Sequence, residues 1–359
     1  MKKVIILSPA HPLRGGIASS SERLATEFQS SGYEVVMYSF AFQYPNFLFP
    51  GKTQYSIDPA PPNLTIKTMV HSLNPLNWWQ TGKAIANEKA DLIVTRFWLP
   101  FLGPSLGTVL KIAKKNSRTK VVAIADNVIP HEKRIGDRPL TQYFINAVDA
   151  FIVMSRSVKD DLRQFTTHKR VKYVPHPIYD NYGAIADRPT ALQQLQLDPA
   201  PRYLLFFGFI RAYKGLDLLL KAMGDPRIKN KPLKLLIAGE FYDKPDKYQQ
   251  IIQLENIDNQ VIVHSDYIPG DKVKYYFGAA DVVVQPYKTA TQSGISQLAY
   301  HFEKPMIVTN VGGLPEIVDH HQSGYVVPVS ETAVADAIVD FFEQERLKPM
   351  TKAVREKKA

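Results

Sequence analysis

The stretch LLFFGFIRAYKGLDLLLKA (204–222) combines a strand, a loop and a helix. The apolar run at 204–207 ends at Gly208, the loop carries Arg211 and Lys214, and a helix is predicted to begin near Gly215. An unbroken apolar run of this length is typical of a buried strand. A buried strand that leads through a short loop into a helix is the repeating unit of a parallel α/β sheet.

The same kind of apolar run recurs along the whole chain. Ten runs are separated by helical patterns, which indicates parallel strands covered on both faces. They fall into two sets of five, and each set predicts one doubly wound sheet. The first set is 2–8, 34–40, 91–97, 120–126 and 150–155, and the second is 203–209, 233–240, 261–265, 281–287 and 305–310.

A proline-rich and polar stretch separates the two sets. We therefore predict a first domain at 1–177, a linker region at 178–200, a second domain at 201–345 and a C-terminal helix or tail at 346–359. The length of 359 residues is enough for two domains. Ligands of such sheets bind outside the carboxyl ends of the strands, so the expected active site is an interdomain cleft between two facing Rossmann-like domains.

Composition restricts the class of protein. The chain has no cysteine, which excludes disulfides and thiol nucleophiles, and no apolar run approaches the roughly 18 residues that span a bilayer. No signal-peptide pattern precedes the first strand, so a cytoplasmic location is expected. The net charge of +10 favours an anionic partner, or reflects a generally basic surface. No arginine-rich tract supports a nucleic-acid partner.

Three turns carry the candidate chemistry. After the first strand, Gly15 and Gly16 precede a helix, so their backbone N–H groups can approach an anion, although a plain tight turn explains them equally well. After 204–207, the cations Arg211 and Lys214 suit a diphosphate and the negative charge on a departing phosphate. After 281–287, small polar residues before a helix form a neutral cradle: Thr291, Gln292, Ser293 and Gly294.

These stretches together resemble a known enzyme family. FGFIRAYKGLDLLLKA (207–222), PMIVTNVGGLPEIVDHHQSGYVV (305–327) and GGIA (15–18) are similar to motifs of retaining glycosyltransferases of the GT-B fold, family 4, also called group 1. The resemblance covers essentially the whole chain and is more specific in the second half. It implies an α/β GT-B fold and a nucleotide diphosphate sugar as the donor.

The resemblance also assigns residues to the donor. Lys214 matches the lysine that contacts the donor diphosphate, and Arg211 would be the second cation. Gly208 is a further candidate for donor binding, and members often carry arginine directly after the corresponding glycine, where this chain has Phe209. The Gly15–Gly16 pair matches the loop that closes on the diphosphate from the acceptor domain.

Two positions depart from the family pattern. Members often have two glutamates eight residues apart around the third turn, and this chain has Ala290 and Leu298 there. The sugar and ribose would then be bound by Thr291, Gln292, Ser293, Gly294 and the nearby Gln297.

The acceptor side offers fewer signals. At the end of the strand at 120–126, where relatives often present a histidine, stand Asp126 and Asn127, and His131 follows. Asp126 is a candidate catalytic residue, while Asn127, His131 and Trp98 are candidates for acceptor binding. The aromatic residues at 78–79 and 97–101, with the positive net charge, favour an acceptor at the inner membrane surface and peripheral contact of the protein. Packing between helix and sheet also explains these aromatics.

The sequence contains no motif for a metal or a cofactor, so no metal is expected. The predicted function is transfer of a hexose to a saccharide or lipid-linked glycan acceptor in envelope or exopolysaccharide biosynthesis. Two alternatives remain open: a noncatalytic partner subunit that binds sugar nucleotides, favoured by Ala290 and Leu298, and a sugar-nucleotide epimerase. The sequence leaves the donor base, donor sugar, acceptor, linkage and oligomeric state open.

Overall fold

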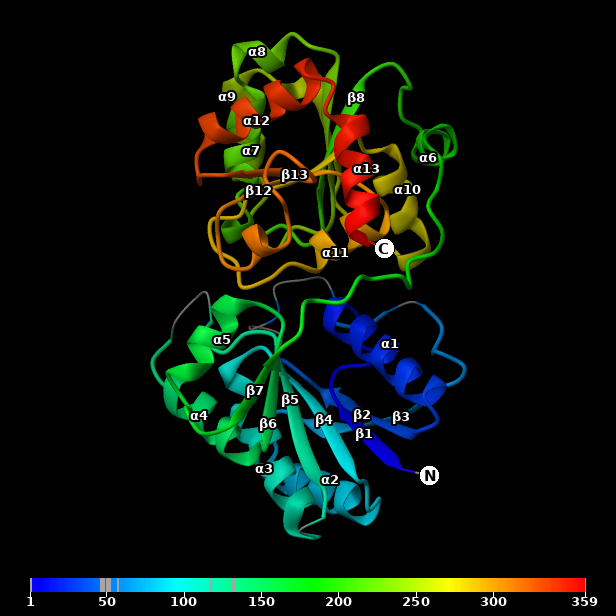
Figure 1. The fold of residues 1–359 in the computed structure, drawn as a ribbon, viewed down its shortest axis with the longest axis vertical. Coiled ribbons are helices and arrows are strands. Elements are labelled where there is room, and N and C mark those ends of the chain that lie inside the picture. Colours follow the sequence, from blue (N-terminus) through cyan, green and yellow to red (C-terminus); the bar gives the residue numbers. More distant parts are fainter. Residues whose placement is uncertain are drawn as a thin grey trace. The chain divides into compact units, whose positions relative to one another are not determined.

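The computed structural model describes residues 2–45, 49, 53–56, 58–116, 118–130 and 134–358. The chain divides into two compact units, Met1–Pro175 and His176–Ala359. Each unit contains its own parallel sheet with helices on both faces, as the ribbon in Figure 1 shows. The predicted α/β class with two doubly wound sheets is thereby confirmed.

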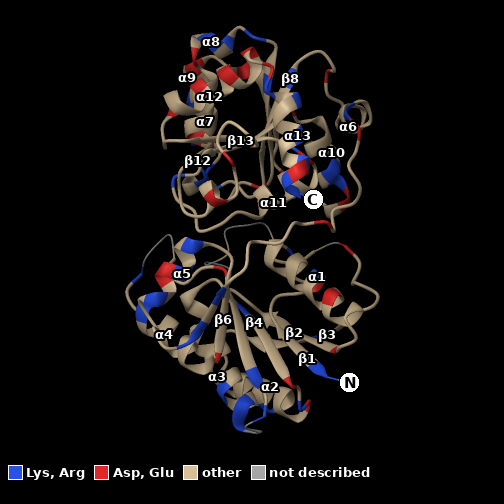
Figure 2. Cartoon of the chain, viewed as in Figure 1, with Lys and Arg blue, Asp and Glu red and all other residues tan. Residues whose placement is uncertain are grey.

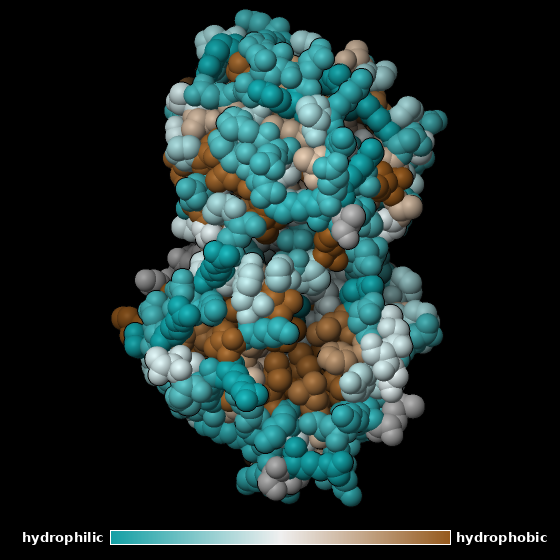
Figure 3. Space-filling model, viewed as in Figure 1, coloured by the Kyte–Doolittle hydropathy of each residue, from teal (hydrophilic) through white to brown (hydrophobic). Residues whose placement is uncertain are grey.

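The first unit has seven strands among its described residues, in the order β3-β2-β1-β4-β5-β6-β7. Alternate residues of β1 face opposite layers: Ile5 and Leu7 belong to the core beneath α2, α3 and α4, whereas Val4 and Ile6 pack with α1. On the α1 side Figure 3 shows apolar side chains at the surface over the strands. The elements are β1 (Lys3–Leu7), α1 (Gly16–Ser30), β2 (Glu34–Phe42), β3 (Thr65–His71), α2 (Pro75–Asn87), β4 (Leu92–Phe97), α3 (Gly103–Ala113), β5 (Lys120–Ala125), α4 (Asp137–Ala147), β6 (Ala150–Val153), α5 (Arg156–Arg163) and β7 (Arg170–Tyr173).

The second unit has six strands among its described residues, in the order β10-β9-β8-β11-β12-β13. Leu204 and Phe206 of β8 face the layer that contains α7, α9 and α12, and Leu205 and Phe207 face α10 and α11. The elements are α6 (Arg188–Leu195), β8 (Arg202–Phe207), α7 (Leu216–Met223), α8 (Pro226–Lys229), β9 (Leu233–Ala238), α9 (Asp246–Glu255), β10 (Val261–His264), α10 (Val273–Ala279), β11 (Val282–Gln285), α11 (Gly294–His301), β12 (Met306–Thr309), β13 (Gly324–Val327), α12 (Glu331–Glu343) and α13 (Leu347–Lys358).

All ten predicted strands are present, but the prediction missed β3, β7 and β13. Each of these three strands lies at the edge of its sheet. An edge strand needs less apolar surface than a central one, and exposed residues alternate with half-buried ones along β7. Unbroken apolar runs therefore do not mark edge strands such as β3 and β7, although β10, which also lies at an edge, was predicted. Exposure does not explain the missed β13, which is mostly buried.

The boundary between the units lies at Pro175 and His176, close to the predicted end of the first domain. Residues 178–200, predicted as a linker, belong to the second unit and include α6, whose Ala191 and Leu192 are buried in its core. The predicted C-terminal tail forms α13, which is held by the buried side chains of Met350 and Val354.

Candidate active site

The second unit has a topological switch point between β8 and β11. From β8 the chain order runs outward through β9 and β10 in one direction, and from β11 through β12 and β13 in the other. In parallel sheets a crevice opens at such a point, outside the carboxyl ends of the strands. The loops that follow β8 and β11 carry Lys214 and Ser293, so the structure brings the second and third predicted turns together.

Backbone contact fixes these two loops against each other. Gly215 has a φ of +68°, and a Cβ atom at this position would lie 1.9 Å from the carbonyl oxygen of Pro286. The backbone N–H of Lys288 also donates to the carbonyl of Tyr213 at 2.7 Å. The glycine after Lys214 is therefore required by the close approach of the two loops, and this contact sets the position of the lysine.

Lys214 is a buried cation at this junction. Its side chain is 9% exposed, and its Nζ atom lies 5.7 Å from the centre of the Tyr287 ring. Within the part of the chain that the structure describes, no carboxylate or carbonyl accepts a hydrogen bond from this ammonium. Burial, together with the charge of Arg211, lowers the pKa of Lys214 to about 7. An unpaired buried ammonium is costly, so the site favours an anion as its partner.

Arg211 lies beside a group of aromatic rings at the carboxyl ends of β8, β9 and β10. Its guanidinium carbon is 5.0 Å from the centre of the Tyr242 ring. Phe209 contacts the same tyrosine, with ring centres 4.5 Å apart, and lies 6.5 Å from the ring of Tyr267. The phenylalanine that replaces the family's arginine thus belongs to an aromatic cluster, and Arg211 is half-buried against it.

The loop after β11 is built around the start of α11. Ser293 is the N-cap of this helix and accepts a hydrogen bond from the backbone N–H of Ile295 at 3.3 Å. Its hydroxyl also lies 3.4 Å from that of Tyr287. The carbonyl of Thr291 accepts a hydrogen bond from the N–H of Gly313 at 3.1 Å. Thr291, Gln292 and Gly294 remain partly exposed.

The two positions where the family has glutamates are structural here. Leu298 is buried in the core of the second unit, and Ala290 packs against the same core. The Ala290 carbonyl oxygen would lie 1.6 Å from a Cβ atom on Gly312, so the backbones of the β11 and β12 loops touch. Gln297 is also buried, on α11.

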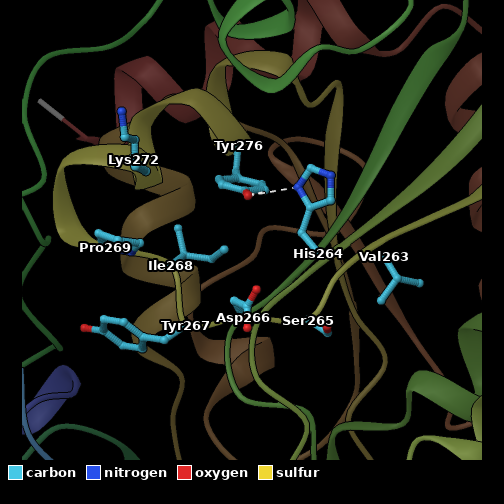
Figure 4. Close-up of a pocket in the computed structure, with 9 residues that line it drawn as sticks. All are labelled: Val263, His264, Ser265, Asp266, Tyr267, Ile268, Pro269, Lys272 and Tyr276. Carbon is cyan, nitrogen blue, oxygen red and sulfur yellow. Dashed lines mark hydrogen bonds between the residues drawn. The ribbon is translucent and has the colours of Figure 1, made fainter.

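A pocket at the carboxyl end of β10 was not predicted from the sequence. This pocket has a volume of about 390 Å³ and is shown in Figure 4. On one wall the Nδ1 atom of His264 and the hydroxyl of Tyr276 are hydrogen-bonded at 2.9 Å, and burial lowers the pKa of His264 and raises that of Tyr276. No sequence motif marks this pocket, because the end of a strand and the following loop form it together. The lining residues are Val263, His264, Ser265, Asp266, Tyr267, Ile268, Pro269, Lys272 and Tyr276.

The first unit has its own switch point, between β1 and β4. Gly15 and Gly16 follow β1, and Gly15 has a φ of +114° with nothing within 4 Å of the position that a Cβ atom would take. The space beside this turn is open among the described residues, which is compatible with a ligand there. Trp98 follows β4 on the other side of the switch point, but it packs on the core and its indole N–H bonds to the Tyr44 hydroxyl.

Asp126 has a partner inside the first unit. Its carboxylate forms a bidentate ion pair with the guanidinium of Arg96, whose Nε donates to Oδ2 at 2.9 Å, and both residues are buried. Arg96 also donates to the hydroxyl of Ser20 on α1 at 2.9 Å. The structure thus gives Asp126 a role in joining β4, β5 and α1, and its predicted catalytic role stays a prediction.

The other acceptor candidates are placed in part. Asn127 is half-buried, and its N–H donates to the carbonyl of Phe97 at 3.3 Å. Its Oδ1 atom is buried and has no hydrogen-bond donor among the residues that the structure describes. His131 lies outside the described residues. Within the described ranges no group of three or more His, Cys, Asp or Glu side chains could hold a metal ion. None of the described helices has the length and apolar character needed to cross a membrane.

Comparison with known families accounts for most of the chain. The family profile described as "Glycosyltransferase Family 4" matches residues 14–181. The profile described as "Glycosyl transferases group 1" matches residues 201–344. The two matched ranges follow the two units of the structure and include the Gly15–Gly16 turn and the Lys214 loop.

Individual relatives agree with the families. A D-inositol 3-phosphate glycosyltransferase of Segniliparus rotundus is 24% identical over 264 residues, which is 72% of this chain and 55% of that protein. The chain thus matches about half the length of this relative. Among solved structures, sucrose-phosphate synthase of Thermosynechococcus elongatus has a TM-score of 0.78 at 17% identity, and Anabaena HepE in complex with UDP has 0.74 at 16%. The alignments cover all of this chain and 94% of each of those chains.

Proposed function

This chain belongs to the family 4, group 1 glycosyltransferases, and on that premise we propose that it transfers a hexose from a nucleotide diphosphate sugar to a saccharide or lipid-linked glycan. The observation that carries the proposal is the buried ammonium of Lys214 at the switch point of the second unit. It has no anionic partner within the described residues, and Arg211 comes from the same loop. The donor diphosphate is an anion of the size and charge that this pair can bind.

The donor would extend along the carboxyl ends of the second sheet. The pocket beyond β10 is wide enough for a nucleobase. The aromatic cluster of Phe209, Tyr242 and Tyr267 connects it to the loop after β8, because Tyr267 lines the pocket and Phe209 belongs to that loop. The loop after β11, at 291–294, and Gln297 would take the sugar and ribose hydroxyls. The complex of Anabaena HepE with UDP supports this choice of ligand class, since that protein has the same fold.

The proposed reaction retains the configuration at the anomeric carbon. The bond from this carbon to the phosphate oxygen breaks, a bond to the acceptor oxygen forms on the same face, and the acceptor proton moves to the departing phosphate oxygen. Lys214 and Arg211 stabilise the negative charge that develops on that phosphate. No dedicated protein base is needed in this scheme. Gly15 and Gly16 are the further residues that we assign to diphosphate binding.

We propose that the acceptor binds to the first unit. A lipid-linked or saccharide acceptor in envelope or exopolysaccharide biosynthesis would lie beside the open turn at Gly15. Asp126, Asn127 and Trp98 follow neighbouring strands of the same sheet edge.

A thermal-shift screen with UDP, GDP, ADP, TDP and CMP, with and without Mg²⁺, tests donor binding. A ligand that binds only the folded state raises the melting temperature. At a ligand concentration a hundredfold above Kd, it adds ~3 kcal/mol to the free energy of unfolding. A selective shift identifies the donor class, and its sugars are then followed by NMR. Transfer or slow hydrolysis with retention supports the proposal. Binding without turnover supports a noncatalytic partner subunit, and a changed donor sugar without nucleotide release supports an epimerase. If no nucleotide shifts the melting temperature, all three functions are overturned.

A further inference from the structure

Tyr287 is buried where the loops after β8 and β11 meet the start of α11. It is 3% exposed, and its carbonyl accepts a hydrogen bond from the hydroxyl of Thr309 at the end of β12. Its ring meets the ring of Tyr213, from the loop after β8, edge to face at 6.2 Å between centres. Its hydroxyl lies 3.4 Å from that of Ser293, the N-cap of α11. Backbone, ring and hydroxyl therefore each have a contact, and these contacts fix the orientation of the side chain.

The ammonium of Lys214 lies against the same ring. Its Nζ atom is 5.7 Å from the centre of the Tyr287 ring, which is within the range of a cation–π contact. Gly208 leaves room for the ammonium, because a Cβ atom there would lie 3.4 Å from Nζ and 3.2 Å from the Cδ1 atom of Ile295. Ile295 belongs to the first turn of α11. The loop after β8 thus places its lysine next to Gly208, the first turn of α11 and the Tyr287 ring.

The elements around this ammonium carry no negative charge. Residues 203–216 and 282–302, which include both loops and all of α11, contain no Asp or Glu. Figure 2 shows α11 in tan along its whole length. Acids from elsewhere do not replace them: among the described residues no acidic side chain raises the pKa of Lys214, which burial and Arg211 lower. An aromatic face attracts an ammonium without neutralising it, whereas a carboxylate would compete with an anionic ligand.

We propose that Tyr287 is a positioning residue of the donor site, whose ring holds the Lys214 ammonium in the place where the donor diphosphate binds. This role rests on the proposed function, since it assumes that Lys214 binds the diphosphate. A lysine side chain has many rotamers, and ordering them at the moment of binding costs affinity. The ring contact orders the lysine before the ligand arrives. Tyr287 thus acts through Lys214 and needs no contact with the donor.

A purely structural role makes a different prediction. Tyr287 belongs to the same hydrophobic core as Leu298 and Tyr300. If its ring only fills that core, replacing it lowers the melting temperature, and the fraction that stays folded binds a diphosphate as before. If its ring positions Lys214, the affinity of the folded fraction for a diphosphate falls, while its affinity for a ligand without phosphates is unchanged.

Two substitutions of Tyr287 separate the ring from the hydroxyl. Tyr287→Leu removes the ring, so the affinity for a nucleoside diphosphate should fall ~fivefold or more, with the affinity for the matching free nucleoside unchanged. Tyr287→Phe keeps the ring and should recover most of the diphosphate affinity. Calorimetry and NMR titration of the whole chain measure both affinities, with UDP and uridine or with the pair whose base the thermal-shift screen selects. If Tyr287→Leu does not fold, Tyr287→Met, with its longer side chain, takes its place.

A double-mutant cycle with Lys214→Met tests whether the ring acts through the lysine. In the Lys214→Met background, Tyr287→Leu should cause no further loss of diphosphate affinity. The matched control is Tyr300→Leu, which removes a tyrosine of the same core whose ring centre lies 5.9 Å from the ammonium of Lys357. This control should lower the melting temperature and leave the diphosphate affinity unchanged.

Four results would overturn the positioning role. They are an unchanged diphosphate affinity in Tyr287→Leu, an equal loss of affinity for the nucleoside, the same loss in the Lys214→Met background, and an equal loss in Tyr300→Leu. If Lys214→Met itself weakens diphosphate binding, these results leave the proposed function intact. If Lys214→Met binds the diphosphate as tightly as the unchanged chain, the proposed diphosphate site fails, and the role of Tyr287 fails with it.

Discussion

Lys214 and Tyr287 come from different strands and meet in one buried contact, with the ammonium 5.7 Å from the ring centre. Lys214 belongs to the loop after β8, and Tyr287 follows β11. Burial lowers the pKa of the lysine and raises that of the tyrosine, so both groups are held in a poorly solvated space. A buried ammonium without a hydrogen-bond acceptor lowers the stability of the folded protein. An anionic ligand that pairs with this ammonium would restore that stability.

Replacing Lys214 should separate function from stability. Lys214→Met removes an unpaired buried charge, so the melting temperature should stay level or rise. Affinity for the nucleoside diphosphate should fall ~10- to 100-fold, because a charge-assisted hydrogen bond is lost, and turnover should fall by about 10² or more. Thermal unfolding, calorimetry and donor hydrolysis measure the three quantities.

Lys304 is the matched control for this variant. It is also a buried lysine, and burial lowers its pKa to about 8, but its ammonium donates to the carbonyl of Ala280 at 2.9 Å. Lys304→Met should leave that carbonyl unpaired and lower stability by ~1–3 kcal/mol while diphosphate affinity is unchanged. Equal loss of affinity in both variants would mean that Lys214 has no specific role.

The lowered pKa of Lys214 predicts pH-dependent binding. In the free protein the lysine loses its proton as the pH rises through about 7, and only the charged form attracts a diphosphate. Binding should therefore weaken by about tenfold per pH unit above 7, until the pKa of the complex is reached. At pH 8 the complex should take up close to one proton, which calorimetry in buffers of different ionisation enthalpy detects. Proton uptake that persists in Lys214→Met would refute the assignment.

Gly312 is predicted to be essential for the shape of the third loop. Its φ is +52°, and a Cβ atom would lie 1.6 Å from the Ala290 carbonyl oxygen, so Gly312→Ala must displace the backbone next to Thr291. Gly32 has a φ of +83° and open space around it, so Gly32→Ala should cost only ~1–2 kcal/mol of backbone strain. We expect Gly312→Ala to cost clearly more, and to weaken donor binding in any folded fraction. Similar melting temperatures for the two variants would show that the loop accommodates a Cβ atom at 312 and that Gly312 is not essential for its shape.

Asp126 can be tested as structural or catalytic through its partner. Asp126→Ala leaves the guanidinium of Arg96 buried without its carboxylate, which should cost ~3–5 kcal/mol. The double variant Arg96→Met/Asp126→Leu removes both charges and should regain most of that stability. If Asp126 contacts the transferred sugar, the stable double variant should bind the donor normally but have no turnover. Normal turnover of the double variant would show that Asp126 only holds β4, β5 and α1 together.

Much of the fold was predictable from local patterns. The unbroken apolar runs identified the central strands, because residues buried on both faces must be apolar at every position. The edge strands β3, β7 and β13 escaped the same search. The glycines and cations of the turns were also visible in the sequence, and the family motifs around Lys214 gave the enzyme class. The pocket beyond β10 was not visible, because no motif describes the space between a strand end and the next loop.

The sequence by itself therefore determined the two sheets, the turns at their carboxyl ends and the family. Only the tertiary structure decided what those residues face. It buried Lys214 against Tyr287, paired Asp126 with Arg96, and turned Trp78 inward and Trp79 outward. The physical reason is the range of the interactions: strand and helix signals arise within a few residues of sequence, whereas burial, ion pairing and pKa depend on groups that the chain brings together from far apart.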